Sequence, residues 1–241
     1  NLLKPVIKTK PFSLLGKKSQ RFGFKDITHI IQNKPEGQLH PGKLARVLIQ
    51  TLQCKGVQIL NGVEVKNYEE HAGEILLQTN HAYPLTTSQL LICNNGLSGG
   101  LLPNISTMPA RGQVLLTSEI KELPWKGTFH FDEGYYYFRN LGKRVLLGGA
   151  RNKAFSEEET FSLETSDFIQ LELERFLKEV ILPGKTFSID HRWSGTMGMG
   201  QSKLPDLSRL SENVYAVVNL GGIGVAMAPY LGEEVARLIE I

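Results

Sequence analysis

Hydrophobic residues recur at helical spacing in two long segments of the sequence. The first runs from Pro41 to Gly56, and it begins at a proline and ends at a glycine, as helices commonly do. Its apolar face comprises Leu44, Val47, Leu48, Thr51 and Leu52. The second covers residues 161–182 and ends at Pro183-Gly184. Its apolar face comprises Phe168, Leu171, Phe176, Leu177 and Val180. Both segments are predicted to be helices.

Shorter β-rich segments fill most of the remaining chain from residue 57 onward. They cover residues 57–60, 62–70, 74–80, 88–96, 111–119, 127–134, 135–140, 143–151 and 187–198. Turn residues at 132–134 and 140–142 predict an antiparallel meander between the segments that they join. An apolar strand, a glycine-rich turn and an amphipathic helix close the chain from Val214 onward. We therefore expect an α+β fold with mixed and antiparallel sheets, not a regular doubly wound sheet.

Composition narrows the classes of protein that need to be considered. The 241 residues suffice for one large domain or two small ones, and a net charge of +3 without basic runs argues against nucleic-acid binding. The only two cysteines, Cys54 and Cys93, lack metal-ligand or redox spacing and favour a reducing compartment. No apolar stretch of membrane-spanning length is present, so a cytoplasmic location is expected. The weakly patterned first 40 residues suggest a fragment of a longer protein.

The closing turn, Asn219-Leu220-Gly221-Gly222-Ile223-Gly224, is the first candidate for chemistry. Its glycines allow the main chain to approach a flat ligand, and the helix that follows presents free amides to an anionic or polarised group. The same glycines would also suit a tight turn that only packs a strand on a helix. These residues alone leave both interpretations open.

A succession of motifs resembles the FAD-dependent oxidoreductases of the D-amino-acid oxidase/glycine oxidase family. The motifs are HPGKL at 40–44, GVQILNGVEV at 56–65, LLICNNGLSGGLLP at 90–103, MPARGQ at 108–113, GYYYFRN at 134–140, RVLLGGAR at 144–151, HRWSG at 191–195 and the closing turn. The resemblance covers about residues 38–241 and implies FAD as cofactor. It also implies that the N-terminal Rossmann βαβ unit with GxGxxG, which binds the ADP part of FAD, is missing from these 241 residues.

The resemblance implies four segments with different roles. Residues 1–60 would be a partial FAD-binding segment with a helix, 61–110 part of the FAD-binding sheet, 111–190 the substrate domain and 191–241 the C-terminal FAD-binding segment. Carried over position by position, the cofactor-binding residues are Val65, Asn95, Gly96, Gly221, Gly222, Ile223, Gly224 and Val225. Val65 would meet the adenine, although a plain strand valine fits its surroundings equally well. The closing turn would place its amides against the isoalloxazine ring.

Tyr136 and Arg139 are the candidate substrate-binding residues. They lie in the aromatic strand segment 135–140, where a guanidinium beside phenols would grip a carboxylate. The alternative is an aromatic face packed on the core, with Arg139 extending outward. No candidate acid, base or metal ligand emerges from the scattered histidines.

Two glycines mark a departure from the family pattern. Glycine oxidase-like members often carry arginines near the positions of Gly198 and Gly222, and these bind the substrate carboxylate. The expected function is nevertheless oxidation of the C–N bond of an amino acid or related amine by hydride transfer to flavin. The alternative is a non-catalytic fragment or subunit that needs a separate FAD-binding partner.

Overall fold

The computed structural model describes residues 4–98, 101–102 and 104–239, which form two compact units. Unit 1 comprises Asn1–Leu39, Gly112–Glu158 and Leu163–Gly195, and unit 2 comprises His40–Arg111, Glu159–Ser162 and Thr196–Ile241. Each unit is therefore assembled from segments that are distant in the sequence. The structure confirms the α+β class. Within the LLICNNGLSGGLLP motif, Gly99, Gly100 and Pro103 lie outside the described residues.

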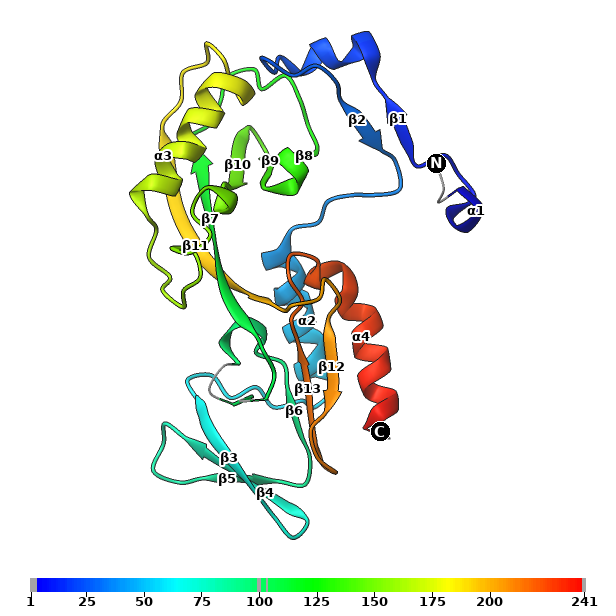
Figure 1. Cartoon of the computed structure of the whole chain (residues 1–241), viewed down its shortest axis with the longest axis vertical. Helices are drawn as coiled ribbons and strands as arrows, with labels where there is room; N and C mark the ends of the chain where they lie inside the picture. The colour runs from blue at the N-terminus through cyan, green and yellow to red at the C-terminus, as the bar shows by residue number, and fades with distance from the viewer. Residues whose placement is uncertain (1–3, 99–100, 103, 240–241) are drawn as a thin grey trace. The chain divides into compact units, whose positions relative to one another are not determined.

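Unit 1 is built on a five-stranded sheet with the order β11-β7-β10-β9-β8 (Figure 1). Its strands are β7 (Met108–Thr117), β8 (Thr128–Phe131), β9 (Tyr136–Leu141), β10 (Arg144–Gly149) and β11 (Ile189–Met199). Residues 108–111 of β7 and 196–199 of β11 belong to unit 2. β8, β9 and β10 pair antiparallel in sequence order, with Phe129 opposite Phe138 and Phe138 opposite Leu147. The predicted meander is confirmed, and its turn contains η3 (Asp132–Gly134).

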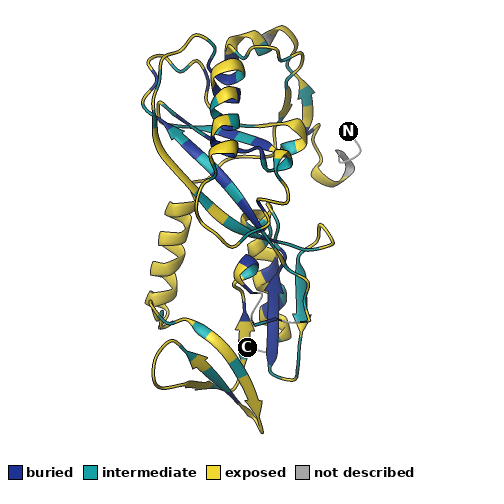
Figure 2. Ribbon diagram, turned by 60° about the vertical axis from the view of Figure 1, so that its left-hand side comes forward, coloured by how far each residue is buried: buried dark blue, intermediate teal, exposed yellow. Residues whose placement is uncertain are grey.

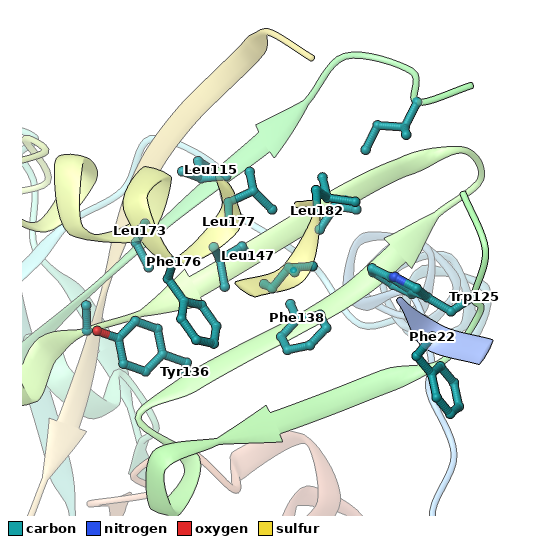
Figure 3. Close-up of a cluster of buried hydrophobic side chains, with 14 of the residues drawn as sticks. Phe22, Leu115, Trp125, Tyr136, Phe138, Leu147, Leu173, Phe176, Leu177 and Leu182 are labelled. Carbon is teal, nitrogen blue, oxygen red and sulfur yellow. The ribbon is translucent and has the colours of Figure 1, made fainter. Parts of the chain in front are cut away.

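The core of unit 1 lies between this sheet and α3 (Asp167–Phe176). Leu115 and Leu147 from the sheet and Leu173 and Leu177 from the helical segment are fully buried. Figure 3 shows these side chains converging, with Tyr136, Phe138 and Phe176 beside them. Alternate residues of β9 are buried, as expected for a strand with one face on the core.

The helix of unit 1 starts later than the sequence predicts. α3 begins at Asp167 because Ser166 caps it: the Ser166 hydroxyl accepts a hydrogen bond from Ile169 N at 3.5 Å. After Phe176 the segment continues as a π-helical turn, η5 (Leu177–Ile181).

The predicted apolar face of this helix is partly wrong. Phe168 and Leu171 are exposed, whereas Ile169 and Leu173 are buried together with Phe176 and Leu177. The sheet covers the stripe that includes Ile169 and Leu173, and the apolar residues beside this stripe face solvent.

Unit 2 contains two small sheets. In the first, with the order β12-β13-β6, β13 (Val214–Val218) pairs parallel with β6 (Leu90–Ile92) and antiparallel with β12 (Asp206–Arg209). Every residue of β13 is buried. The second sheet is an antiparallel meander of β3 (Val65–His71), β4 (Glu74–Thr79) and β5 (Leu85–Thr87).

Two helices of unit 2 match the sequence pattern closely. α2 (Pro41–Cys54) is capped by His40, whose Nδ1 accepts a hydrogen bond from Lys43 N at 3.3 Å. α4 (Gly224–Leu238) follows the closing turn and packs on β13 through Leu231 and Val235. In the part of the chain that the structure describes, no helix is long and apolar enough to cross a membrane.

Several local expectations differ from the structure. The strand predicted over residues 57–60 is absent from the described chain, because Val57 and Leu60 are exposed and pair with no other strand. In the weakly patterned first 40 residues, β1 (Phe12–Leu14) pairs with β2 (Ile31–Asn33). The remaining short elements are α1 (Lys4–Ile7), η1 (Gly16–Phe22), η2 (Asn95–Leu97) and η4 (Arg151–Lys153).

Candidate functional site

The closing turn connects the fully buried strand β13 to α4. At the end of β13, Asn219 adopts φ +59°, and Gly221 adopts φ +53° two residues later. These left-handed conformations reverse the chain within a few residues, and asparagine and glycine tolerate them best. The sequence thus places a sharp exit between a buried strand and the start of a helix.

Two hydrogen bonds fix the turn to other segments of unit 2. Leu220 N donates to the side-chain Oδ1 of Asn95 at 3.1 Å, and Gly221 N donates to the carbonyl of Gly198 at 3.0 Å. η2, which begins at Asn95, and the end of β11 therefore both hold the closing turn. The predicted residues Asn95 and Gly221 are thereby brought together through these bonds.

Glycines make this close approach possible. A Cβ on Gly96 would lie 2.7 Å from the carbonyl carbon and oxygen of Met197, and one on Gly198 would lie 2.5 Å from Asn95 Oδ1. A Cβ on Gly200 would lie 2.9 Å from the Asn219 side chain. Gly96 is a predicted cofactor-binding residue, Gly198 was singled out from the sequence only as a departure from the family pattern, and Gly200 was not identified. The recurrence of glycine in GTMGMG, residues 195–200, is the sequence feature that could have identified Gly198 and Gly200.

Gly222 differs from these glycines because it faces open space. Apart from Gly222 itself and its two chain neighbours, no atom lies within 4 Å of the position of a Cβ on Gly222. Gly222, Ile223 and Val225 are exposed, and Ile223, at the N-cap of α4, has no side-chain oxygen to cap the helix. The first N–H groups of a helix have no partner inside the helix and carry partial positive charge. The turn therefore presents an accessible surface suited to an acceptor atom of a flat ligand.

Val65 lies in a different part of unit 2. It begins β3, is half-buried and pairs with Thr79 across the antiparallel β3-β4 ladder. The neighbouring Glu64 N donates to Asn80 Oδ1 at 3.0 Å, which fixes the start of the strand. The contact of Val65 with adenine stays a prediction.

Tyr136 lies in the core of unit 1. Its ring centroid is 4.5 Å from that of Phe176, and its hydroxyl donates to Glu172 Oε1 at 2.7 Å. Burial and this hydrogen bond raise the pKa of the Tyr136 phenol. The acceptor of this bond, the Glu172 carboxylate, also accepts hydrogen bonds from the Arg175 guanidinium. The Arg175 guanidinium lowers the pKa of Glu172, and the Tyr136 hydroxyl lowers it further.

Arg139 lies on the opposite face of β9 from Tyr136, because the two are an odd number of residues apart along the strand. Its guanidinium donates to the carbonyl of Leu39 at 2.5 Å and, through Nε, to the carbonyl of Asn140 at 3.5 Å. Burial raises the pKa of Tyr137, which shares this face. The two candidate substrate-binding residues are therefore not brought to one surface, and their roles stay predictions.

A separate cavity of about 600 Å³ lies within unit 1. Its walls include the aromatic rings of Phe22, Phe24, Phe129, Phe138 and Phe176. None of the residues predicted from the sequence to bind cofactor or substrate lines it. Most of the predicted site residues lie in or next to the closing turn, and none lies in the wall of this cavity.

Comparison with known proteins gives a family and a set of related folds. The model of the FAD dependent oxidoreductase family, DAO, matches residues 11–238. Gamma-glutamylputrescine oxidoreductase of Escherichia coli is 24% identical over 214 residues, which are 84% of this chain and 48% of that protein.

Two solved structures share the fold. Glycine oxidase from Geobacillus kaustophilus has a TM-score of 0.83 at 16% identity, over 99% of this chain and 65% of that one. L-proline dehydrogenase from P. horikoshii has a TM-score of 0.78 at 20% identity, over 95% of this chain and 64% of that one. The chain thus spans about half the length of the curated relative and about two thirds of these structures.

Proposed function

Because the chain belongs to the family of FAD-dependent oxidoreductases, we propose that it forms the flavin-ring and substrate-binding part of an amine-oxidising flavoenzyme. The reaction is oxidation of the C–N bond of an amino acid or related amine by hydride transfer to flavin. The names of the relatives, which include a glycine oxidase and a gamma-glutamylputrescine oxidoreductase, support this substrate class. The observation that carries the proposal is the open, doubly anchored closing turn.

The residues of the turn fit the flavin ring through their main chain. Gly221, Gly222, Ile223, Gly224 and Val225 would hold the ring edge, and the absence of side-chain atoms around Gly222 leaves room for a planar group. The amides at the start of α4 would stabilise negative charge on the ring, a task for which pre-oriented donors are effective. FAD supplies the hydride acceptor. Asn95 and Gly96 would keep the turn in place, and Val65 would contact the adenine.

For the substrate, the Arg139 guanidinium would release the Leu39 carbonyl and donate its hydrogen bonds to the substrate carboxylate instead. Tyr136 would contribute by supporting β9 from the core, because its hydroxyl is already engaged by Glu172. No side chain is required to remove a proton from carbon, since a neutral amine activates its own neighbouring C–H bond. The protein's tasks are orientation and exclusion of water.

A second candidate function follows from the extent of the match. The relatives are about half as long again as this chain or longer, and in this second candidate the 241 residues act as a subunit or fragment whose FAD affinity depends on a separate FAD-binding partner. In that case the closing turn has the same role, but only in the larger assembly.

The test is a titration of the purified chain with FAD, followed by visible absorbance and flavin fluorescence. We expect Gly222→Leu to lower FAD affinity by roughly tenfold or more, because its side chain would occupy the open space that the proposal assigns to the ring. Gly232→Leu is the matched control, since Gly232 is exposed on α4 and also has no atom within 4 Å of a Cβ. Unchanged affinity in Gly222→Leu would refute the role of the turn, and a chain that binds no FAD would favour the second candidate.

A further inference from the structure

The cavity of unit 1 lies between the main sheet and the N-terminal segment of the same unit. Phe129 of β8, Phe138 of β9 and Phe176 of α3 form one wall, and residues 15–38 form most of the other. Phe138 and Phe176 can be followed in Figure 3, on the face of the sheet that α3 covers. The volume of about 600 Å³ is within the range of about 300–1,000 Å³ found for small-molecule sites.

The N-terminal segment is attached to this face of the sheet by a hydrogen bond and by ring contacts. Lys25 N donates to the carbonyl of Val180 in η5 at 3.0 Å, and the ring centroids of Phe24 and Phe129 are 5.2 Å apart. The rest of the segment is mostly exposed, as its yellow colour near the N label in Figure 2 shows. The cavity therefore has walls that contact each other, and it opens to solvent where Ile31 is 66% exposed.

The interior of the cavity is apolar and largely aromatic. The rings of Phe22, Phe24, Phe129, Phe138 and Phe176 line it, and those of Phe129 and Phe138 are stacked with centroids 4.9 Å apart. Aromatic walls contact another ring or a hydrocarbon chain through their faces and edges. These residues therefore select a ligand whose body is apolar.

The charged residues of the wall give the cavity an excess of positive charge. Arg21 and Lys126 outnumber Glu36, and His29 and His130 add positive charge when they are protonated. Within the described part of the chain, no salt bridge or side-chain hydrogen bond engages Arg21, Lys126 or Glu36. Both cations are exposed, so they lie at the solvent side of an apolar interior. Unpaired cations in this position attract a carboxylate and bind it through charge-assisted hydrogen bonds.

The cavity is separate from the candidate substrate-binding arginine. Phe138 lines the cavity, and Arg139 follows it directly on β9, so the two side chains point to opposite faces of the sheet. The closing turn belongs to unit 2, whereas every residue that lines the cavity belongs to unit 1. A ligand in this cavity therefore occupies a site other than the proposed flavin and substrate sites.

We propose that this cavity binds an apolar monocarboxylate, with the hydrocarbon or aryl body among the phenylalanine rings and the carboxylate beside Arg21 and Lys126. The ligand contacts both the sheet and the N-terminal segment, and its binding stabilises unit 1. The proposal rests on the aromatic interior and the unpaired cations of one unit, and it does not depend on the proposed function.

The first experiment titrates the 241-residue chain at pH 7 with three probes that differ only in charge. They are 6-phenylhexanoate, 6-phenylhexan-1-ol and 6-phenylhexylamine, and nuclear magnetic resonance of labelled isoleucine methyl groups reports where each one binds. We expect 6-phenylhexanoate to shift the methyl signals of Ile27, Ile30 and Ile31, which line the cavity. Ile75 and Ile92, in the core of unit 2, should not shift. The carboxylate should bind roughly tenfold more tightly than the alcohol, and the amine most weakly.

The second experiment compares two charge reversals in the connection between β7 and β8. Lys126→Glu places a negative charge in the wall of the cavity, and Lys121→Glu makes the same change five residues earlier, outside the wall. Both lysines are exposed, so both variants should keep the unfolding midpoint of the parent. Lys126→Glu should weaken binding of 6-phenylhexanoate roughly tenfold and leave binding of the alcohol unchanged, because only the carboxylate is repelled. Lys121→Glu should change neither affinity.

Four outcomes would overturn the proposal. They are unshifted signals of Ile27, Ile30 and Ile31, shifts that spread equally over both units, equal affinities for the three probes, and equal losses in the two lysine variants. Shifts over both units would indicate unspecific adsorption of the phenyl group, and equal affinities would indicate an apolar hollow without selection for charge. None of these measurements requires FAD or turnover, so a failure here is distinguishable from a failure of the proposed flavin site.

Discussion

Glu172 lies between a phenol and a guanidinium. It accepts hydrogen bonds from the Tyr136 hydroxyl at 2.7 Å and from Arg175 Nη2 and Nε at 2.7 and 3.0 Å. Both partners favour the ionised carboxylate, so the pKa of Glu172 is lower than its ordinary value. The same arrangement commits the Tyr136 hydroxyl to the protein interior. Sequence identified Tyr136 as a polar aromatic residue, but only its neighbours decide that its hydroxyl points to Glu172.

Tyr136→Phe keeps the ring and removes one donor to Glu172. We expect a loss of about 1.5–3 kcal/mol in the free energy of unfolding at pH 7, typical for a hydrogen bond to a charged group. The contribution is fully present above the ordinary pKa near 4.5 and is lost as the pH falls through the lower folded value. The difference between parent and variant should therefore shrink below pH 4.5.

Urea unfolding at pH 7 and pH 3 measures this effect. Tyr83→Phe serves as the control, because Tyr83 is exposed and should change nothing. Equal losses at both pH values would show that the hydroxyl stabilises the fold without coupling to Glu172.

The glycines around the closing turn differ sharply in what a methyl group would meet. Gly96→Ala places a Cβ 2.7 Å from the Met197 backbone, which must shift to accommodate it. We expect a loss of about 2 kcal/mol in stability, in the range for overpacking. Gly222→Ala meets no atom within 4 Å and should cost much less. The thermal unfolding midpoints of Gly96→Ala and Gly222→Ala measure this difference, and equal midpoints would contradict the observed packing.

At the scale of elements, α3 shows how a sheet selects part of a helix. Its sequence carries apolar residues around more than half of its circumference, including both Leu171 and Leu173. Of these two leucines, only Leu173 is buried, because it lies in the stripe that contacts the sheet together with Ile169 and Phe176. Helical periodicity predicts that a helix forms and is amphipathic. It does not fix which of two adjacent apolar stripes meets the sheet.

Leu173→Ala and Leu171→Ala separate these two stripes. Leu173→Ala should lower the free energy of unfolding by about 2–5 kcal/mol, because it removes buried methyl groups and leaves a cavity. Leu171→Ala should change it by less than about 0.5 kcal/mol, since Leu171 is exposed. Chemical denaturation followed by circular dichroism gives both values. A comparable loss in the two variants would mean that Leu171 is also packed.

α2 differs from α3 in that none of its residues is buried within the described chain. Its boundaries were predicted to within a residue or two, because His40, Pro41 and Gly56 mark them locally. Its apolar stripe was also identified, yet the described chain offers it no partner. Local signals such as caps and periodicity thus defined the element, while its surroundings depend on residues distant in the sequence.

On the scale of the whole molecule, two compact units are each built from separate stretches of sequence. Residues 1–39 cluster with 112–158 and 163–195, and residues 40–111 cluster with 196–241. The predicted segments already divided the chain discontinuously, with 1–110 and 191–241 assigned to FAD binding and 111–190 to the substrate domain, but they did not foresee that residues 1–39 cluster with 112–158 and 163–195. The assignment of cofactor binding to one unit and substrate binding to the other remains a prediction. Membership of the FAD-dependent oxidoreductase family is established for residues 11–238.

The sequence by itself determined the α+β class, the meander of β8, β9 and β10, the two helices α2 and α4, and the family with its cofactor. These features rest on short-range periodicity, turn residues and an ordered set of motifs, all of which are readable along the chain. Tertiary structure alone decided that Asn95 accepts a hydrogen bond from Leu220, that Gly96 and Gly198 permit close backbone approach, and that Tyr136 is committed to Glu172. Each of these facts joins residues that are far apart in sequence. Their proximity depends on how the strands and helices pack, which no local pattern specifies.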